Sequence, residues 1–122
     1  MNRSELLYHY KATVNRVVDG DTVNLTIDLG FSTHWKSNCR LAGIDTPEIK
    51  GVDEATKAQG GKAKQFVLDK LIPVLGKPAD VLIKSTHLDK YGRPVVILYY
   101  GDNFEYNLNQ ELVDRGLAEA IK

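Results

Sequence analysis

Apolar and polar residues alternate along much of this chain, which is the pattern of strands that bury one face. The alternation predicts three strands in the first half of the chain and two in the second half: residues 8–18, 23–29, 34–44, 81–83 and 94–100. The pair Asp19-Gly20 separates the first two strands, and Asp-Gly between strands favours a tight hairpin. The pattern therefore predicts a mainly β protein that begins with a hairpin.

Two segments favour helix instead. Apolar side chains recur at helical spacing through residues 53–71, and Pro73 limits the end of this helix. Asn107 followed by Gln110 is a capping-box pattern that begins a second, short helix, and Gly116 ends it. The predicted order is three strands, a helix, two strands and a helix, with no linker or repeat between them.

Five strands with a helix between the third and fourth match an OB fold, which is a small five-stranded Greek-key barrel. The predicted fold class is mainly β with two helices (α+β), and a mixed open α+β sheet is the competing architecture. A chain of 122 residues is long enough to bury one core without metal or disulfide support. We therefore expect a single domain over residues 1–122.

The composition and charge of the chain limit the kinds of partner that we expect. Hydrophobic residues make up 43% and charged residues 26% of the chain, as in ordinary globular proteins. The formal net charge is zero, which argues against indiscriminate coating of nucleic acid. Residues 101–122 contain five acidic and two basic residues, a balance of −3, so the remainder carries +3 and can still form a local basic groove. Cys39 is the single cysteine, which excludes an intrachain disulfide.

No apolar run approaches membrane-spanning length, and the first dozen residues lack the apolar core of a secretory signal. We therefore expect a cytoplasmic protein with no membrane partner.

Charged residues gather in three segments at predicted strand ends: residues 19–22, 40–48 and 89–93. In an OB fold, the loop between the first two strands and the loop between the last two flank the binding face. The fold therefore predicts that these three segments face one cleft.

The carboxylates in these segments suit a metal site. Asp21 and Asp45 are hard oxygen donors that would bind Ca²⁺ together with a backbone carbonyl and waters. For Asp21, hairpin-turn chemistry is the alternative explanation. Glu48 could act as a general base toward water, or it could be a solvated loop carboxylate.

Two arginines in the same segments suit phosphate. The guanidinium groups of Arg40 and Arg93 are planar forks that match phosphate oxygens and can stabilise charge on a transferring phosphoryl group. Surface ion pairing, which contributes little stability, is the alternative for each.

Together the segments resemble the three blocks of the staphylococcal nuclease (thermonuclease) family. The blocks are residues 19–23 (DGDTV), 40–48 (RLAGIDTPE) and 89–93 (DKYGR), and Asn109 with residues 115–118 (RGLA) extends the likeness. The resemblance implies a Ca²⁺-dependent phosphodiesterase that acts on DNA and/or RNA, on an OB-fold barrel.

The resemblance also implies roles for single residues. Asp21 and Asp45 would be the carboxylate ligands of Ca²⁺, with the main-chain carbonyl of Thr46, and Asp19 would lie just beyond the ligands. Glu48 would be the base for the attacking water.

On the phosphate side, Arg40 and Arg93 would clamp the scissile group during in-line attack. Lys90 and Tyr91 would lie beside the terminal phosphate and the sugar. The cut would leave a 3′-phosphate and a 5′-hydroxyl.

Two departures from the family pattern matter. The family's secreted archetype continues with a further helix, which this chain as given lacks, and the archetype is strongly basic whereas this chain is neutral. Fewer phosphate contacts should give weaker substrate binding. We expect a monomeric enzyme; the alternatives are a non-cleaving OB module that binds nucleic acid or protein, and a domain completed by a partner chain.

Overall fold

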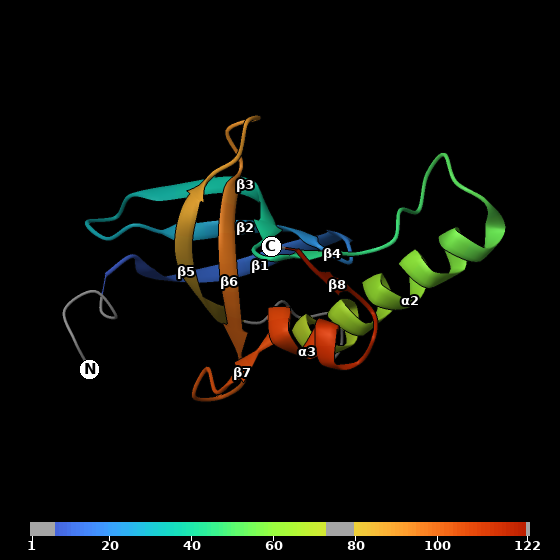
Figure 1. Ribbon diagram of the computed structural model, residues 1–122. Helices are drawn as coiled ribbons and strands as arrows, with labels where there is room; N and C mark the ends of the chain where they lie inside the picture. The colour runs from blue at the N-terminus through green and yellow to red at the C-terminus, as the bar shows by residue number, and fades with distance from the viewer. Residues whose placement is uncertain (1–6, 73–79, 122) are drawn as a thin grey trace.

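The computed structural model describes residues 7–72 and 80–121 (Figure 1). The longer strands, in chain order, are β1 (His9–Asp19), β2 (Thr22–Asp28), β3 (His34–Leu41), β5 (Asp80–Leu88) and β6 (Pro94–Tyr100). Three two-residue strands accompany them: β4 (Ile44–Asp45), β7 (Tyr106–Asn107) and β8 (Glu119–Ala120). The helices are α2 (Glu54–Leu71) and α3 (Leu108–Asp114).

The five longer strands close into a barrel. Antiparallel pairing joins β3 to β2, β2 to β1, β1 to β5 and β5 to β6. Parallel pairing of β3 with β6 then closes the ring, with Arg40 opposite Val95 and Leu41 opposite Val96. The predicted OB-type barrel is confirmed, and the open sheet is wrong. In Figure 1, β5 and β6 cross in front of β1, β2 and β3, while both helices lie at one end.

The core follows from the alternation of apolar residues. Inward-facing side chains of every longer strand are fully buried, among them Val14, Leu25, Cys39, Ile83 and Leu98. Each buried aliphatic side chain of this size contributes about 1.5–3 kcal/mol from its removal from water. This packing holds the ends of β1, β2 and β3 in place.

Asp53 caps helix α2, because its side chain accepts a hydrogen bond from the Thr56 N–H at 2.7 Å. Its buried positions include Gly60, Ala63, Val67 and Leu71. None of the described helices is long and apolar enough to cross a membrane.

The third predicted strand is wrong in its extent. The sequence predicts one strand over residues 34–44, but β3 ends at Leu41 and β4 pairs separately with β8. Gly43 has φ +74°, a left-handed conformation that favours glycine and turns the chain between β3 and β4. Gly43 and the shift of apolar positions from Leu41 to Ile44 interrupt the alternation here, but they do not show that residues 44–45 pair separately with β8.

Asn109 in α3, which is distant in the sequence, hydrogen-bonds to that turn. Its Nδ2 donates to the carbonyls of Ala42 at 2.9 Å and Val96 at 3.1 Å, and its Oδ1 accepts from the Leu98 N–H at 3.0 Å. Because Asn109 is only 6% exposed, these hydrogen bonds satisfy a polar group that would otherwise be costly to bury. Helix α3 is thereby fixed to β6 and to the turn that precedes β4.

One other predicted strand is too short. Strand β5 extends beyond the predicted residues 81–83 to both sides, and β7 and β8 were not predicted, because two residues are too few to show a period. The second helix does begin at its predicted cap, since Asn107 Oδ1 accepts from the Gln110 N–H at 3.0 Å.

The two glycines in the middle of α2 give a matched test of packing. A Cβ on Gly60 would lie 2.5 Å from the Pro47 carbonyl oxygen and 2.8 Å from that of Glu48, whereas one on Gly61 would meet nothing within 4 Å. We expect Gly60→Ala to lower the free energy of unfolding by about 1–3 kcal/mol through overpacking. Gly61→Ala should raise it by up to about 1 kcal/mol through helix propensity. Denaturant unfolding measures both, and equal effects of the two substitutions would contradict the close packing of α2 on the 47–48 backbone.

Candidate active site

The β1–β2 hairpin places Asp21 inside the molecule. The Asp21 N–H donates to Asp19 Oδ1 at 3.2 Å, and the Thr22 hydroxyl donates to Asp21 Oδ1 at 3.2 Å. Gly20 lets α2 approach this turn, because a Cβ on it would lie 2.7 Å from the Cβ of Ala63. The result is a carboxylate that is only 5% exposed and is held by its own turn.

Arg40 joins this buried carboxylate to a second one. Its Nη1 lies 3.1 Å from Asp21 Oδ2, and its Nη2 lies 3.0 Å from Asp45 Oδ1. The Thr46 N–H also donates to Asp21 Oδ2 at 3.2 Å. Asp21 and Asp45 therefore meet around one positive charge, and Asp45, with its side chain 55% exposed, opens the group to solvent.

The surroundings of Asp19 and Asp21 shift the pKa values of these two hairpin acids in opposite directions. Burial raises the pKa of Asp19 to about 6, and the neighbouring Asp21 carboxylate adds to this rise. Burial opposes ionisation of Asp21 as well. Hydrogen bonds from Asp19 and the Thr46 N–H, together with the Arg40 charge, nevertheless hold the pKa of Asp21 below its usual value. Asp21 is therefore the carboxylate that stays ionised, and Asp19 is the one that takes up a proton first.

The β5–β6 turn carries the second cationic group. Asp89 Oδ1 accepts from the N–H groups of Tyr91 and Arg93, both at 2.9 Å, and its Oδ2 accepts from Arg93 Nε at 2.7 Å. The Arg93 guanidinium lies 5.5 Å from the centre of the Tyr91 ring, and Lys90 Nζ lies 5.2 Å from it. Because Asp89 Oδ2 accepts from Nε, the orientation of the Arg93 guanidinium is fixed. Within residues 7–72 and 80–121, neither terminal nitrogen of Arg93 forms a hydrogen bond or ion pair.

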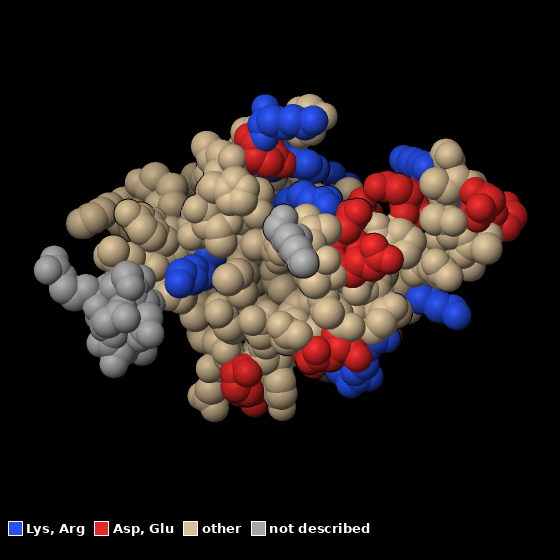
Figure 2. All heavy atoms as spheres, in the orientation of Figure 1, with Lys and Arg blue, Asp and Glu red and all other residues tan. Residues whose placement is uncertain are grey.

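The predicted residues thus fall into two groups. Hydrogen bonds and ion pairs link the members of the first group: Asp19, Asp21, Arg40, Asp45 and Thr46. The second group consists of Lys90, Tyr91 and Arg93. The groups are neighbours, because Arg40 pairs with Val95 across β3 and β6, two residues beyond Arg93. Figure 2 shows acidic and basic side chains intermingled from the tip of the β5–β6 hairpin to the start of α2.

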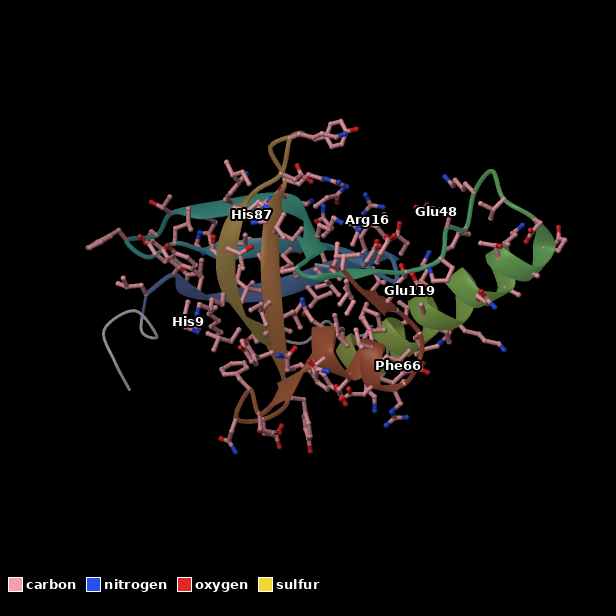
Figure 3. The ribbon with its side chains drawn as sticks, viewed as in Figure 1. His9, Arg16, Glu48, Phe66, His87 and Glu119 are labelled. Atoms are coloured by element: carbon pink, nitrogen blue, oxygen red, sulfur yellow. The ribbon has the colours of Figure 1, made fainter. Side chains whose placement is uncertain are left out.

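Glu48 lies on the extended segment between β4 and α2 (Figure 3). It is exposed, and among the described residues its side chain makes no hydrogen bond or ion pair. The close contact of Gly60 with the carbonyls of Pro47 and Glu48 positions this backbone. Thr46 contacts Asp21 through its N–H, so the ligand role of its carbonyl stays a prediction.

A cavity of about 490 Å³ opens beside the carboxylates. It is lined by the segment after β4, by α2 and by the chain that follows α3: Asp45, Thr46, Pro47, Gln59, Lys62 and residues 116–119. Sequence reasoning missed this cavity, because its walls come from three distant parts of the chain.

Asp89 was also missed as a positioning residue. An aspartate three residues before a glycine, here Gly92, is a turn signal that could have identified it.

The donor set fits a calcium ion. Within residues 7–72 and 80–121, no cluster of three or more His, Cys, Asp or Glu side chains is placed to hold a metal. The carboxylates of Asp21 and Asp45, which flank the Arg40 guanidinium, are nevertheless hard oxygen donors. Calcium accepts main-chain carbonyls and water as its remaining ligands. The residues present can therefore hold Ca²⁺ with several waters.

Comparison with known proteins identifies the family. The family model described as "Staphylococcal nuclease homologue" matches residues 38–122. The chain belongs to this family. The match includes Arg40, Asp45, Glu48 and Arg93, and it begins after the hairpin that carries Asp21.

Three curated relatives extend the comparison over about nine-tenths of the chain. Endonuclease YhcR of Bacillus subtilis is 34% identical over 89% of this chain and 9% of its own length. The uncharacterized protein MJ1439 of Methanocaldococcus jannaschii is 32% identical over 90% of this chain and 58% of its own. Thermonuclease of Staphylococcus hyicus is 28% identical over 88% and 57%. The chain therefore spans less than two thirds of each of these relatives, two of which are named as nucleases.

Removing the Asp19 carboxylate should change how stability depends on pH. A pKa raised from 3.8 to about 6 means that the folded state binds the Asp19 proton more tightly than the unfolded state, so this group makes stability fall as pH rises across that window. Asp19→Asn keeps the acceptor for the Asp21 N–H but does not titrate. We expect the melting temperature of the variant relative to wild type to increase between about pH 4 and 6, with chelator present. A difference that is flat over this range would contradict the raised pKa.

Proposed function

We propose that this chain is a Ca²⁺-dependent nuclease that hydrolyses phosphodiester bonds of DNA and/or RNA and leaves a 3′-phosphate and a 5′-hydroxyl. The observation that carries the proposal is the convergence of Asp21 and Asp45 on Arg40, with Arg93 in the turn that leads into β6, the strand paired with β3. Such a site combines oxygen donors for a cation with guanidinium groups for a phosphate.

In this proposal Asp21, Asp45 and the Thr46 carbonyl hold Ca²⁺. When bound, the ion supplies Lewis-acid polarisation of the phosphate and an ordered water. Asp19 stays outside the ligands and, through its hydrogen bond from the Asp21 N–H, keeps the hairpin turn in position.

Arg40 and Arg93 neutralise the phosphate. Their positions at the ends of adjacent strands let the two guanidinium groups approach one phosphate from two sides. Asp89 orients Arg93 in advance, which lowers the cost of ordering that side chain when substrate binds. Lys90 and Tyr91 lie next to Arg93 on the same turn, where they would contact the terminal phosphate and the sugar.

Glu48 takes the proton of the attacking water. A solvent-exposed carboxylate without a partner among the described residues is free to approach that water, and the backbone contact at Gly60 limits how far it can move. The acidic character of the site opposes the alternative of a module that only binds nucleic acid. A pure binder would gain nothing from carboxylates that repel phosphate.

Replacing Glu48 tests the proposed chemistry. With single-stranded DNA or RNA and millimolar calcium, we expect wild-type hydrolysis that a chelator abolishes. Glu48→Gln should lower kcat by about 10²–10⁴-fold, because it removes the base but keeps the size of the side chain. The control is Glu54→Gln, which makes the same chemical change in the first turn of α2 and should retain wild-type turnover.

Two different outcomes test the role of Glu48 and the nuclease function separately. Unchanged turnover in Glu48→Gln would refute its role as the base. No calcium-dependent hydrolysis by the wild type at any mildly alkaline pH would refute the nuclease function itself.

A further inference from the structure

The β2–β3 hairpin ends in apolar side chains that lie outside the core. Leu29 and Trp35 are each 39% exposed, and Phe31 between them is fully exposed. Trp35 pairs with the buried Ile27, so it continues the inward-facing row of β3 past the end of the barrel. Figure 1 shows that this hairpin extends beyond β5 and β6, at the end of the barrel away from α2. The tip is therefore an apolar projection.

The backbone of the tip makes Phe31 an unusual residue at its position. The Leu29 N–H donates to the Thr33 carbonyl, and the Thr33 N–H donates to the Gly30 carbonyl, both at 2.9 Å. The central residues of this turn are left-handed, Phe31 with φ +53° and Ser32 with φ +61°. Positive φ at both central residues is the geometry of a type I′ turn, in which Asn-Gly is a preferred pair. A bulky aromatic residue in this conformation is strained.

The Phe31 side chain does not offset this strain by packing within the chain. It belongs neither to the buried core nor to the partly buried residues that pack against the core. Its full exposure also leaves an apolar ring in water, which is unfavourable. Both the conformation and the exposure of Phe31 therefore lower the stability of the free protein. Backbone strain of this kind is concentrated at functional sites, which directs attention to what the tip contacts.

The size and charge of the tip favour a lipid bilayer over a protein partner. The exposed parts of Leu29, Phe31 and Trp35 offer roughly 400 Å² of surface, whereas a stable protein interface takes about 800 Å² from each partner. Residues 29–35 contain no Lys, Arg, Asp or Glu, so insertion of the tip would remove no such charge from water. Lys36 follows directly, is exposed and forms no ion pair with a described residue, so its ammonium group can reach lipid phosphates.

We infer that the tip of the β2–β3 hairpin inserts into the interface of a lipid bilayer, with Phe31 as its anchor. Trp and Phe side chains are typical of segments that lie at this depth in a membrane. The sequence predicts no membrane partner because it contains no spanning segment, but contact through a hairpin tip needs none. Along β3, Arg40 lies about 20 Å from His34, so the candidate active site would remain in water.

Trp35 is the single tryptophan of the chain, so its fluorescence reports on the tip directly. Vesicles of phosphatidylcholine and phosphatidylglycerol are titrated into the wild-type protein. We expect the emission of Trp35 to shift to shorter wavelength, and a brominated lipid in the same vesicles to quench it, because the ring leaves water for the bilayer interface. Emission that is unchanged at the highest vesicle concentration would overturn the proposal.

Phe31→Asn separates a binding role from a structural one. Asparagine suits the left-handed position, so the variant should melt at a higher temperature than wild type. Its partition into the same vesicles should fall by on the order of tenfold or more, because the anchoring ring is lost. The matched control is Leu88→Asn, which replaces an apolar residue that is 59% exposed on the β5–β6 hairpin and should bind vesicles as wild type does. A lower melting temperature of Phe31→Asn, unchanged vesicle binding by it, or an equal loss in the control would overturn the proposal.

Sedimentation velocity without vesicles distinguishes a bilayer from a second copy of the chain as the partner of the tip. We expect wild type and Phe31→Asn to sediment alike, as monomers. A wild-type dimer that Phe31→Asn dissociates would overturn the proposal, because it would assign the tip to self-association. None of these measurements depends on nuclease activity, so the membrane contact and the proposed function can fail independently.

Discussion

The contact on which the rest of the site depends is the Arg40 guanidinium between two carboxylates. Asp21 comes from the β1–β2 hairpin, Asp45 from β4 and Arg40 from the end of β3, so one cation joins three segments. A carboxylate as buried as Asp21 is stable in its charged form only with such a partner and with hydrogen bonds. Under the proposed function, the same two acids would hold the divalent ion.

The barrel and helices serve to hold this contact. Parallel pairing of β3 with β6 sets Arg40 beside the turn that carries Arg93. On the N-terminal side of Asp45, Asn109 fixes the backbone at Ala42 by a hydrogen bond. On the C-terminal side of Asp45, close packing against Gly60 fixes the backbone at Pro47 and Glu48. Both supports come from helices, Asn109 from α3 and Gly60 from α2.

Much of this arrangement is local and could be predicted. The alternation of apolar and polar residues predicts the longer strands, Asp19-Gly20 predicts the hairpin, and Asn107 predicts the start of α3. The OB topology brings residues 19–22 and 40–46 into contact, and the pairing of β3 with β6 sets the turn of residues 89–93 beside them. The cavity depends on contacts between distant residues, which no local pattern records. Sequence also could not show that Asp21 is buried while Asp45 is exposed, because burial depends on how α2 and β4 pack around the hairpin.

Calcium binding to the metal-free protein tests the central claim most directly. Isothermal titration should show one calcium ion bound by wild type. The affinity of Asp45→Asn should be lower by on the order of tenfold or more, because the proposed site would lose one of its two charged ligands. Asp53→Asn, an exposed acid that caps α2, is the matched control and should bind as wild type does. Equal affinity of wild type and Asp45→Asn would contradict the account.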